Sequence, residues 1–188
     1  MTGISFQVPT INGRRLQIMR AIFPAAVRVG LLLDATAPGT ALTEHEEAAR
    51  TLGFTIQVIV AKEPSEIEAA FATFRSAGIT SVSVAIGGSF PARFPQIASL
   101  ALASGIATSW GAPDAVRAGG LLALGPDQID LYRRSAGYVD KILKGAKPGE
   151  LPLAQPEKFD LILNLKTAAA LGIRIPDAVL AQATEVIR

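Results

Sequence analysis

The sequence predicts a three-layer α/β fold built on a doubly wound parallel sheet. Its clearest pattern is a unit that occurs three times, an alanine-rich helix followed by a glycine and an apolar strand, at 48–60, 71–86 and 97–110. A glycine just past a helix can adopt the left-handed conformation that closes the helix. The strands, such as VRVGLLL at 27–33, are nearly continuous in apolar residues, which indicates burial on both faces and hence a parallel sheet.

Five strands and six helices are expected from this pattern. The strands lie near 27–33, 54–60, 80–86, 106–110 and 121–125, and the helices near 12–22, 41–52, 64–77, 92–104, 112–118 and 127–144. Capping-box patterns at 43–46 and 65–68 mark the starts of two of the helices. Because crossovers between parallel strands are right-handed, we expect the flavodoxin-like strand order 2-1-3-4-5.

A change of composition divides the chain near residue 145. Residues 144–156 read KGAKPGELPLAQP, and their prolines and glycines indicate an extended connector. A sixth strand at 159–165, a short helix at 166–171 and a last helix from Pro176 to the C-terminus are expected after it. We therefore expect a lobe at 1–145 and a second segment at 146–188, made of the connector, one strand and two helices.

Composition excludes several classes of function. The 188 residues are 49% hydrophobic and 18% charged, which is enough apolar material for a real core. The chain has no cysteine, so it cannot form a disulfide, a Cys-ligated zinc site or a thiol nucleophile. Its net charge of +2 comes from scattered basic residues, so no nucleic-acid-binding face is expected.

Neither a signal peptide nor a membrane span is expected from the sequence. Residues 1–9 lack a basic region followed by an apolar run, the pattern of a signal peptide. The apolar stretches elsewhere are too short to cross a bilayer.

Ligands of an open parallel sheet bind beyond the carboxyl ends of its strands, where the strand order reverses. The loops at that edge are rich in Gly, Pro, Ser and Thr, which offer backbone donors and small hydroxyls to a polar solute. We expect the ligand-binding residues to be Thr36, Ser89, Phe90, Trp110 and Asp114. The same residue types are common in ordinary turns, and spacing alone favours that interpretation of the loops. For Trp110, packing and contact with a ligand fit equally well.

The sequence offers little for catalysis. His45 is the single histidine and stands between acids, so we expect it on an exposed helix face. The Gly87-Gly88-Ser89 stretch lacks the lysine of a phosphate-binding loop. The acids near the strand ends are Asp34, Asp114 and Asp127, too few for a receiver-type acidic cluster. We expect no catalytic residue, no metal and no cofactor.

The C-terminal third carries a resemblance to a known family. From Gly125 it reads GPDQIDLYRRSAGYVDKILKGAKPGELPLAQPEKFDLILNLKTAAALGIRIPDAVLAQATEVI, which closely resembles the end of the ABC-transporter substrate-binding protein family. That family has the type I periplasmic-binding-protein fold, with two lobes. Upstream, NGRRLQIMRAIFPAAVRVGLLL resembles the beginning of the family's second lobe. The chain therefore resembles one lobe, the second, together with the C-terminal segment.

This resemblance implies a function without chemistry. It implies the solute-binding component of an ABC-type importer in the periplasm, which closes two lobes around a small organic solute such as an amino acid and docks on a membrane permease. A small-molecule sensor domain of a regulator remains the alternative, and a doubly wound enzyme a more distant one. The loops depart from the family pattern, with Asp34-Ala35 in place of Asn-Pro and 87–90 in place of Asp-Pro-Leu-Phe.

The resemblance also implies how the sixth strand pairs. In the family, the strand matching 159–165 leaves the second lobe and joins the sheet of the first. Within this chain it is therefore expected to lack a partner, and unpaired apolar strands favour association. From this we expect either a fold-back along the lobe or a homodimer through 159–171.

Overall fold

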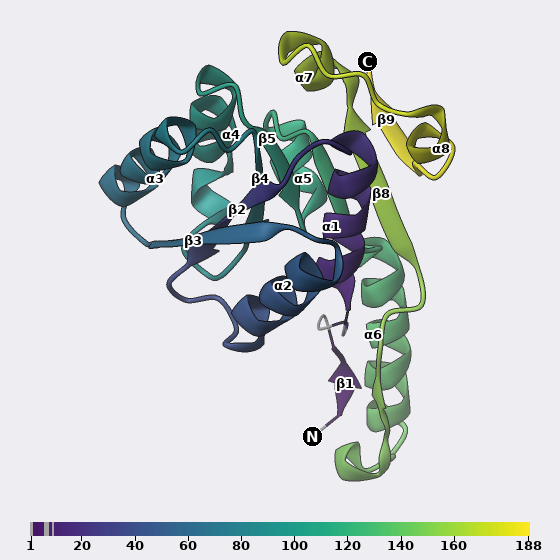
Figure 1. Cartoon of the computed structure of the whole chain (residues 1–188). Coiled ribbons are helices and arrows are strands. Elements are labelled where there is room, and N and C mark those ends of the chain that lie inside the picture. The colour runs from purple at the N-terminus through teal and green to yellow at the C-terminus, as the bar shows by residue number, and fades with distance from the viewer. Residues whose placement is uncertain (1, 6–7, 9) are drawn as a thin grey trace.

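A seven-stranded sheet forms the centre of the computed structural model, which describes residues 2–5, 8 and 10–188 (Figure 1). Residues 1, 6, 7 and 9, which belong to the segment tested for a signal peptide, lie outside the described residues. Across the sheet the order is β3-β2-β4-β5-β6-β8-β9. The strands are β2 (Arg28–Asp34), β3 (Thr55–Ala61), β4 (Ser81–Ala85), β5 (Ala107–Trp110), β6 (Leu122–Pro126), β8 (Phe159–Asn164) and β9 (Glu185–Ile187).

The first five of these strands confirm the predicted fold class. They pair in parallel throughout, in the order 2-1-3-4-5 of their appearance along the chain. Their bounds agree with the expected ranges to within one or two residues. Successive side chains of these strands point to opposite faces of the sheet, and both faces are buried. Leu32 and Val84 belong to one core cluster, whereas Leu31 and Ala85 belong to another on the opposite face. A sheet buried on both faces requires helices on both sides.

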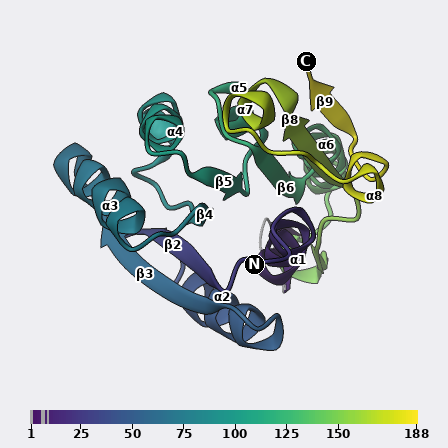
Figure 2. The same cartoon turned by 45° about the horizontal axis from the view of Figure 1, so that its top comes forward.

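Helices cover both faces, as the tilted view in Figure 2 shows. Three of them, α3, α4 and α5, lie on one face, and α1 and α2 lie on the other. Their bounds are α1 (Ile11–Ile22), α2 (Thr40–Thr51), α3 (Pro64–Ser76), α4 (Phe94–Ala103, preceded by the turn η1 at Pro91–Arg93) and α5 (Pro113–Arg117). Although α1 precedes the first sheet strand, it packs beside α2 and over β4, β5 and β6. This position brings α1 to the sheet edge that matters for function.

The glycines that end the helices behave as the sequence predicts. Gly53, Gly78 and Gly105 have φ angles of 70°, 71° and 70°, in the left-handed region that glycine reaches without strain. The helix starts differ from the expected capping boxes. Helix α3 is capped two residues earlier, by Glu63 and Glu66, whose side chains bond reciprocally to the backbone. Helix α2 begins at Thr40, so the pattern at 43–46 lies inside it.

The C-terminal segment departs from expectation. Strand β8 is not left unpaired, because it pairs antiparallel with β6, from Leu122 opposite Leu163 to Pro126 opposite Phe159. The expected final helix from Pro176 is wrong beyond its first turn: α8 covers Asp177–Leu180, and the chain then forms β9, which pairs in parallel with β8. Since both edges of β8 are occupied, the reason for expecting a homodimer through 159–171 disappears. The short helix is α7 (Leu165–Ala170).

Helix α6 (Gln128–Leu143) and the connector after it project from the lobe (Figure 1). The connector contains the turn η2 (Pro148–Glu150) and β7 (Leu153–Ala154), which pairs in parallel with β1 (Gly3–Ile4). Leu131 is the one buried residue of α6 within the described chain. The helix carries instead an exposed apolar stripe on a single face, composed of Ile129, Tyr132, Val139 and Leu143.

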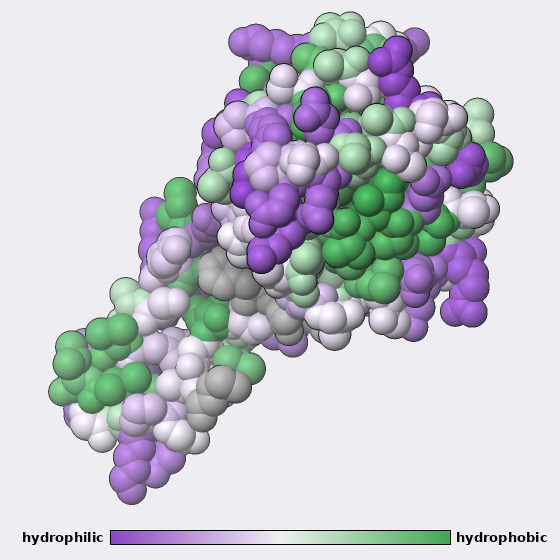
Figure 3. All heavy atoms as spheres, turned by 90° about the vertical axis from the view of Figure 1, so that its left-hand side faces the viewer, coloured by the Kyte–Doolittle hydropathy of each residue, from purple (hydrophilic) through white to green (hydrophobic). Residues whose placement is uncertain are grey.

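Figure 3 shows hydrophobic residues on the surface of this projection, at its lower end. Leu143 is 82% exposed there, and Leu153 of the connector is 55% exposed. No helix among the described residues is long and apolar enough to cross a membrane.

Candidate functional site

The structure brings the loops with the expected ligand-binding residues to one edge of the sheet. Thr36 follows β2, Ser89 and Phe90 follow β4, and Trp110 ends β5. Because these strands are parallel, all these positions lie at the carboxyl edge. The hydroxyl of Thr36 accepts a hydrogen bond from Gly88 N–H at 2.7 Å, which joins the first two loops directly.

Asp34 organises these loops. Its side chain is buried and accepts five hydrogen bonds at 2.8–3.1 Å, from the Thr36 amide and hydroxyl and from the backbone amides of Gly87, Ser89 and Phe90. Burial raises the pKa of Asp34, but the hydrogen bonds from Thr36, Ser89 and Phe90 outweigh it and hold the pKa below its ordinary value. Asp34 is thus a structural anion that holds the loops after β2 and β4 together.

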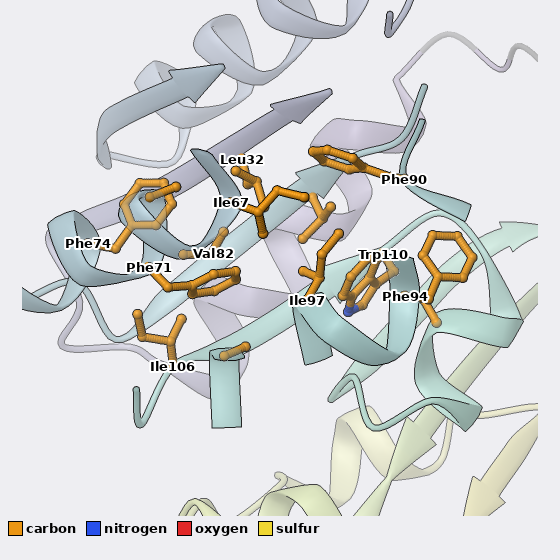
Figure 4. Packing of buried hydrophobic residues seen from close by; sticks show 14 of the residues in the cluster. Leu32, Ile67, Phe71, Phe74, Val82, Phe90, Phe94, Ile97, Ile106 and Trp110 are labelled. Carbon is orange, nitrogen blue, oxygen red and sulfur yellow. The ribbon is translucent and has the colours of Figure 1, made fainter. Parts of the chain in front are cut away.

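Phe90 and Trp110 belong to the core of the lobe. Both are completely buried, and Trp110 packs edge-on against Phe94 with ring centroids 5.4 Å apart. Figure 4 shows these aromatic rings in the same apolar layer as Ile97. The indole N–H of Trp110 donates to the Thr108 hydroxyl at 2.8 Å, so its polar atom is used internally. Trp110 therefore packs in the core through both its ring and its indole nitrogen.

The two remaining expected residues are exposed or half-buried. Asp114 begins α5, and its carboxylate forms an exposed ion pair with Arg117 at 3.0 Å. Ser89 is half-buried in the loop held by Asp34. Whether Thr36, Ser89, Phe90, Trp110 or Asp114 contacts a ligand stays a prediction. None of the five lines the pocket that opens at this edge.

That pocket has a volume of about 330 Å³. It lies between α1 and α2 and the ends of β4, β5 and β6, with Val8, Ile11, Asn12, Arg15, Pro38, Thr40, Ala41, Glu44, Ala85, Ile86, Gly111, Ala112 and Pro126 as its lining. Such a volume lies at the lower end of the range for small-molecule sites. Most of the lining is apolar, and its charged groups are Arg15 and Glu44. A larger groove of about 470 Å³ lies away from the carboxyl edge, between α1, β8 and α8.

Arg15 is the central polar residue of the pocket. It is 8% exposed, and its Nε donates to the carbonyl of Leu124 at 2.8 Å while Nη1 donates to Asn12 Oδ1 at 2.6 Å. Asn12 in turn donates to Glu44 Oε2 at 2.5 Å. Burial lowers the pKa of Arg15 to about 10, and the negative charge of Glu44 opposes this shift. The guanidinium is therefore still cationic at neutral pH.

His45 lies directly behind the pocket and is completely buried, so the expectation of an exposed histidine is wrong. Its Nδ1 donates to the carbonyl of Ala41 at 2.6 Å, and its Nε2 accepts from the Ser83 hydroxyl at 2.9 Å. Ser109 continues this chain to Ser83 at 3.4 Å. Since a carbonyl only accepts, Nδ1 must carry a proton. The Ser83 hydroxyl could accept or donate, so it is the low pKa of the ring that leaves Nε2 as an acceptor at neutral pH. Burial first, and then the charge of Arg15, lower the pKa of His45 to about 4 despite the opposing bond to Ala41.

The sequence holds a signal for these missed residues. On α1, Arg15 stands four residues after Ile11 and four before Met19, within the apolar stripe that faces the sheet. On α2, His45 stands midway between Ala41 and Ala49, the other buried residues of that helix. A charged or ionisable residue at a core position of an amphipathic helix indicates a buried polar site.

Two glycines make the floor of the pocket possible. A Cβ on Gly111 would lie 2.6 Å from Nη2 of Arg15, and a Cβ on Gly125 would lie 2.3 Å from the carbonyl oxygen of Gly111. The second clash is with backbone, which cannot move aside as a side chain can. The ends of β5 and β6 therefore approach each other closely only because both positions lack a side chain.

Replacing Gly125 with alanine should destabilise the protein by about 2 kcal/mol, because overpacking at a backbone contact forces the two strands apart. Chemical unfolding monitored by circular dichroism would measure the loss. Gly137→Ala is the matched control, since Gly137 lies on the exposed part of α6 with nothing within 4 Å of a new Cβ. The control should be neutral or slightly stabilising, and equal effects of the two substitutions would contradict the close packing of Gly125.

The arrangement suits recognition of a small molecule. The described residues hold no group of three or more acidic, histidine or cysteine side chains that could bind a metal ion. The carboxylate of Asp34 is occupied by five internal donors, and the imidazole of His45 is enclosed in the core. What the edge presents to solvent is a mainly apolar pocket whose buried cation, Arg15, retains a donor nitrogen.

Solved structures of known proteins share this architecture. A conserved domain protein from Vibrio cholerae O1 biovar El Tor is 25% identical, with a TM-score of 0.86 over 98% of this chain. The ABC domain in complex with L-Trp from Streptococcus pneumonia is 27% identical, with a TM-score of 0.87 over 99% of this chain. A substrate-binding protein with adhesive properties from Clostridium difficile, 20% identical, has the same fold, with a TM-score of 0.75 over 99% of this chain. The chain spans 62%, 64% and 62% of these three proteins.

A comparison with curated proteins found no match. The family model for ABC transporter substrate binding protein matches residues 1–187, which is nearly the whole sequence. The motifs at the C-terminal end, the parallel sheet in the order 2-1-3-4-5 and the pocket at its carboxyl edge agree with this match. The chain belongs to the family of ABC transporter substrate-binding proteins.

Proposed function

We propose that this chain provides one half of the solute cleft of an ABC-type importer and holds a small organic solute, such as an amino acid, in the pocket between α1, α2 and the carboxyl ends of β4, β5 and β6. The observation that carries the proposal is this pocket, with a buried Arg15 at the sheet edge where ligands of such folds bind. The complex of the Streptococcus relative with L-Trp supports an amino acid as the solute class.

The same proposal includes a location and a partner for the chain. Family membership supports the periplasm as the site of action and a membrane permease as the partner of the closed form. Binding and release would involve no covalent step, and an enzymatic role finds no support in the charged groups of the pocket. These assignments concern the whole relatives, of which this chain spans under two thirds.

The exposed stripe of α6 supports a second lobe as the covering partner. Ile129, Tyr132, Val139 and Leu143 lie on one exposed face of α6, a helix that packs beside β1. Burying large apolar side chains of this kind is worth about 1.5–3 kcal/mol each. We infer that the portion of the relatives outside this chain packs here and closes over the pocket, in place of a homodimer through 159–171.

On its own, the chain should bind solutes weakly. Pro38 and Thr40 on the rim of the pocket are exposed, so a solute would bury only part of its surface, whereas tight sites bury most of it. Isothermal titration calorimetry with amino acids, small organic acids and sugars should give dissociation constants weaker than about 1 μM. A micromolar or tighter constant would contradict the half-cleft, and the absence of binding by every member of the panel would overturn the proposed function.

A further inference from the structure

Arg15 keeps one nitrogen available in the pocket. Its Nε and Nη1 are used by Leu124 and Asn12, whereas Nη2 makes no hydrogen bond to any described residue. The backbone of Gly111 lies beside Nη2, and both residues line the pocket. A glycine at this position leaves Nη2 uncovered, because a Cβ would lie 2.6 Å away. The pocket therefore contains a fixed cationic donor without a partner.

Glu44 keeps one oxygen available in the same pocket. Oε2 accepts from Asn12, while Oε1 makes no hydrogen bond in the described part of the chain. Glu44 is half-buried and lines the pocket from α2. Asn12 lies between the two charges, bonded to Arg15 through Oδ1 and to Glu44 through Nδ2. Asn12 therefore holds a cationic donor and an anionic acceptor at a fixed separation.

Arg15 and Glu44 are not satisfied by each other. No ion pair within 4.0 Å involves Arg15 among the described residues. A buried charge without a direct counter-ion is costly, and a bound anion would relieve that cost. A carboxylate suits a guanidinium because both are planar and form charge-assisted hydrogen bonds. The remaining walls, which include Ile11, Ala85, Ile86 and Ala112, are apolar and would accept a side chain.

We propose that Arg15 Nη2 binds the carboxylate and Glu44 Oε1 the ammonium of a free α-amino acid, so that the pair selects zwitterions over solutes with a single charge. The assignment deepens the proposed function and rests on it. Asn12 acts as the positioning residue, since it bridges the two recognising groups.

An NMR titration of this chain tests the assignment, because chemical shifts report binding in the millimolar range. The probes are the twenty protein amino acids and, for each that binds, the matched acid without its amino group and the matched amine without its carboxyl group. For L-tryptophan these are indole-3-propionate and tryptamine. The amide of Gly111 and the Nε of Arg15 report occupancy of the pocket. The amino acid should bind at least about tenfold more tightly than either analogue.

Glu44→Gln is the decisive variant. It keeps an oxygen for Asn12 but removes the charge, so the amino acid should bind about tenfold more weakly while its deaminated analogue is unaffected. Glu46→Gln, on the exposed face of the same helix, is the control and should change neither affinity. Arg15→Lys should weaken binding of the amino acid and binding of its deaminated analogue to the same extent. If Arg15→Lys does not fold, Gly111→Ala covers Nη2 instead and should weaken the same two ligands.

Either of two results with a bound amino acid would overturn the assignment. One is equal binding of an amino acid and its deaminated analogue by the wild type. The other is an unchanged preference in Glu44→Gln. A pocket that binds no amino acid would overturn it as well. In that case a neutral solute, such as a sugar, that shifts the Gly111 amide would leave the proposed function standing, so the two failures are distinguishable.

Discussion

Asp34→Ala should lose roughly 4 kcal/mol of unfolding free energy, the largest effect that we expect from one substitution. The carboxylate accepts five hydrogen bonds, and three of the donors are backbone amides of the loop that follows β4. Hydrogen bonds to a charged group contribute about 1.5–3 kcal/mol each, and buried donors left without a partner add a penalty. Because Phe90 is in the core, the disturbance should spread from the loop into the apolar layer of α3 and α4.

Urea unfolding with linear extrapolation would measure this loss. Asp34→Asn should be intermediate, because its amide group places an N–H donor where one acceptor oxygen stood. Asp140→Ala is the matched control, since Asp140 forms an exposed ion pair with Lys144 on α6, and such pairs contribute at most about 1 kcal/mol. A loss for Asp34→Ala no greater than that of the control would show that the loops do not depend on this carboxylate.

The second large effect is a loss of stability on mild acidification, caused by His45. Its pKa is about 4 in the folded protein, below the ordinary value of 6.5. Between these values the unfolded chain binds a proton that the folded chain excludes, so stability falls as the pH drops from 6.5 towards 4. At about 1.36 kcal/mol for each pKa unit, the loss amounts to roughly 3 kcal/mol. The contribution is fully present above pH 6.5.

Unfolding curves between pH 4 and pH 7 would measure this slope, compared with those of His45→Gln. Glutamine has a donor for Ala41 and an acceptor for Ser83 but does not titrate, so its stability should change much less over the window. The pKa of Asp34 lies below its ordinary value, so the loss that it causes falls at lower pH than the His45 window. Parallel pH profiles of the wild type and His45→Gln would exclude His45 as the titrating group.

Sheet order could be predicted from sequence because its causes are local. Glycine after each helix and apolar strands such as β2 fix where elements start and stop, and the handedness of crossovers then leaves few arrangements. The C-terminal strand could not be placed in this way. The apolar sequence of β8 indicates only that this strand pairs with other strands. Whether the neighbouring strand is β6 or belongs to another sheet depends on the path of the connector.

The candidate site was found only in part, for a physical reason. Loop residues at the carboxyl edge were expected to contact the ligand, but Phe90 and Trp110 are buried in the core. The amide and hydroxyl of Thr36 and the amide of Phe90 donate their hydrogen bonds to Asp34. The charged groups of the pocket come instead from helices. Helix α1 reaches the edge by lying across three strands that follow it in the chain, a contact that no local pattern reveals.

The antiparallel return of β8 has a consequence for how the chain acquires its fold during synthesis. Strand β8 is synthesised after β6, α6 and the whole connector. Until β8 emerges from the ribosome, the edge of the parallel sheet that β6 forms therefore has no partner strand. Open edges template intermolecular pairing. The nascent lobe thus has its most vulnerable interval late, between the end of β6 and the arrival of β8, when most of its core is already assembled.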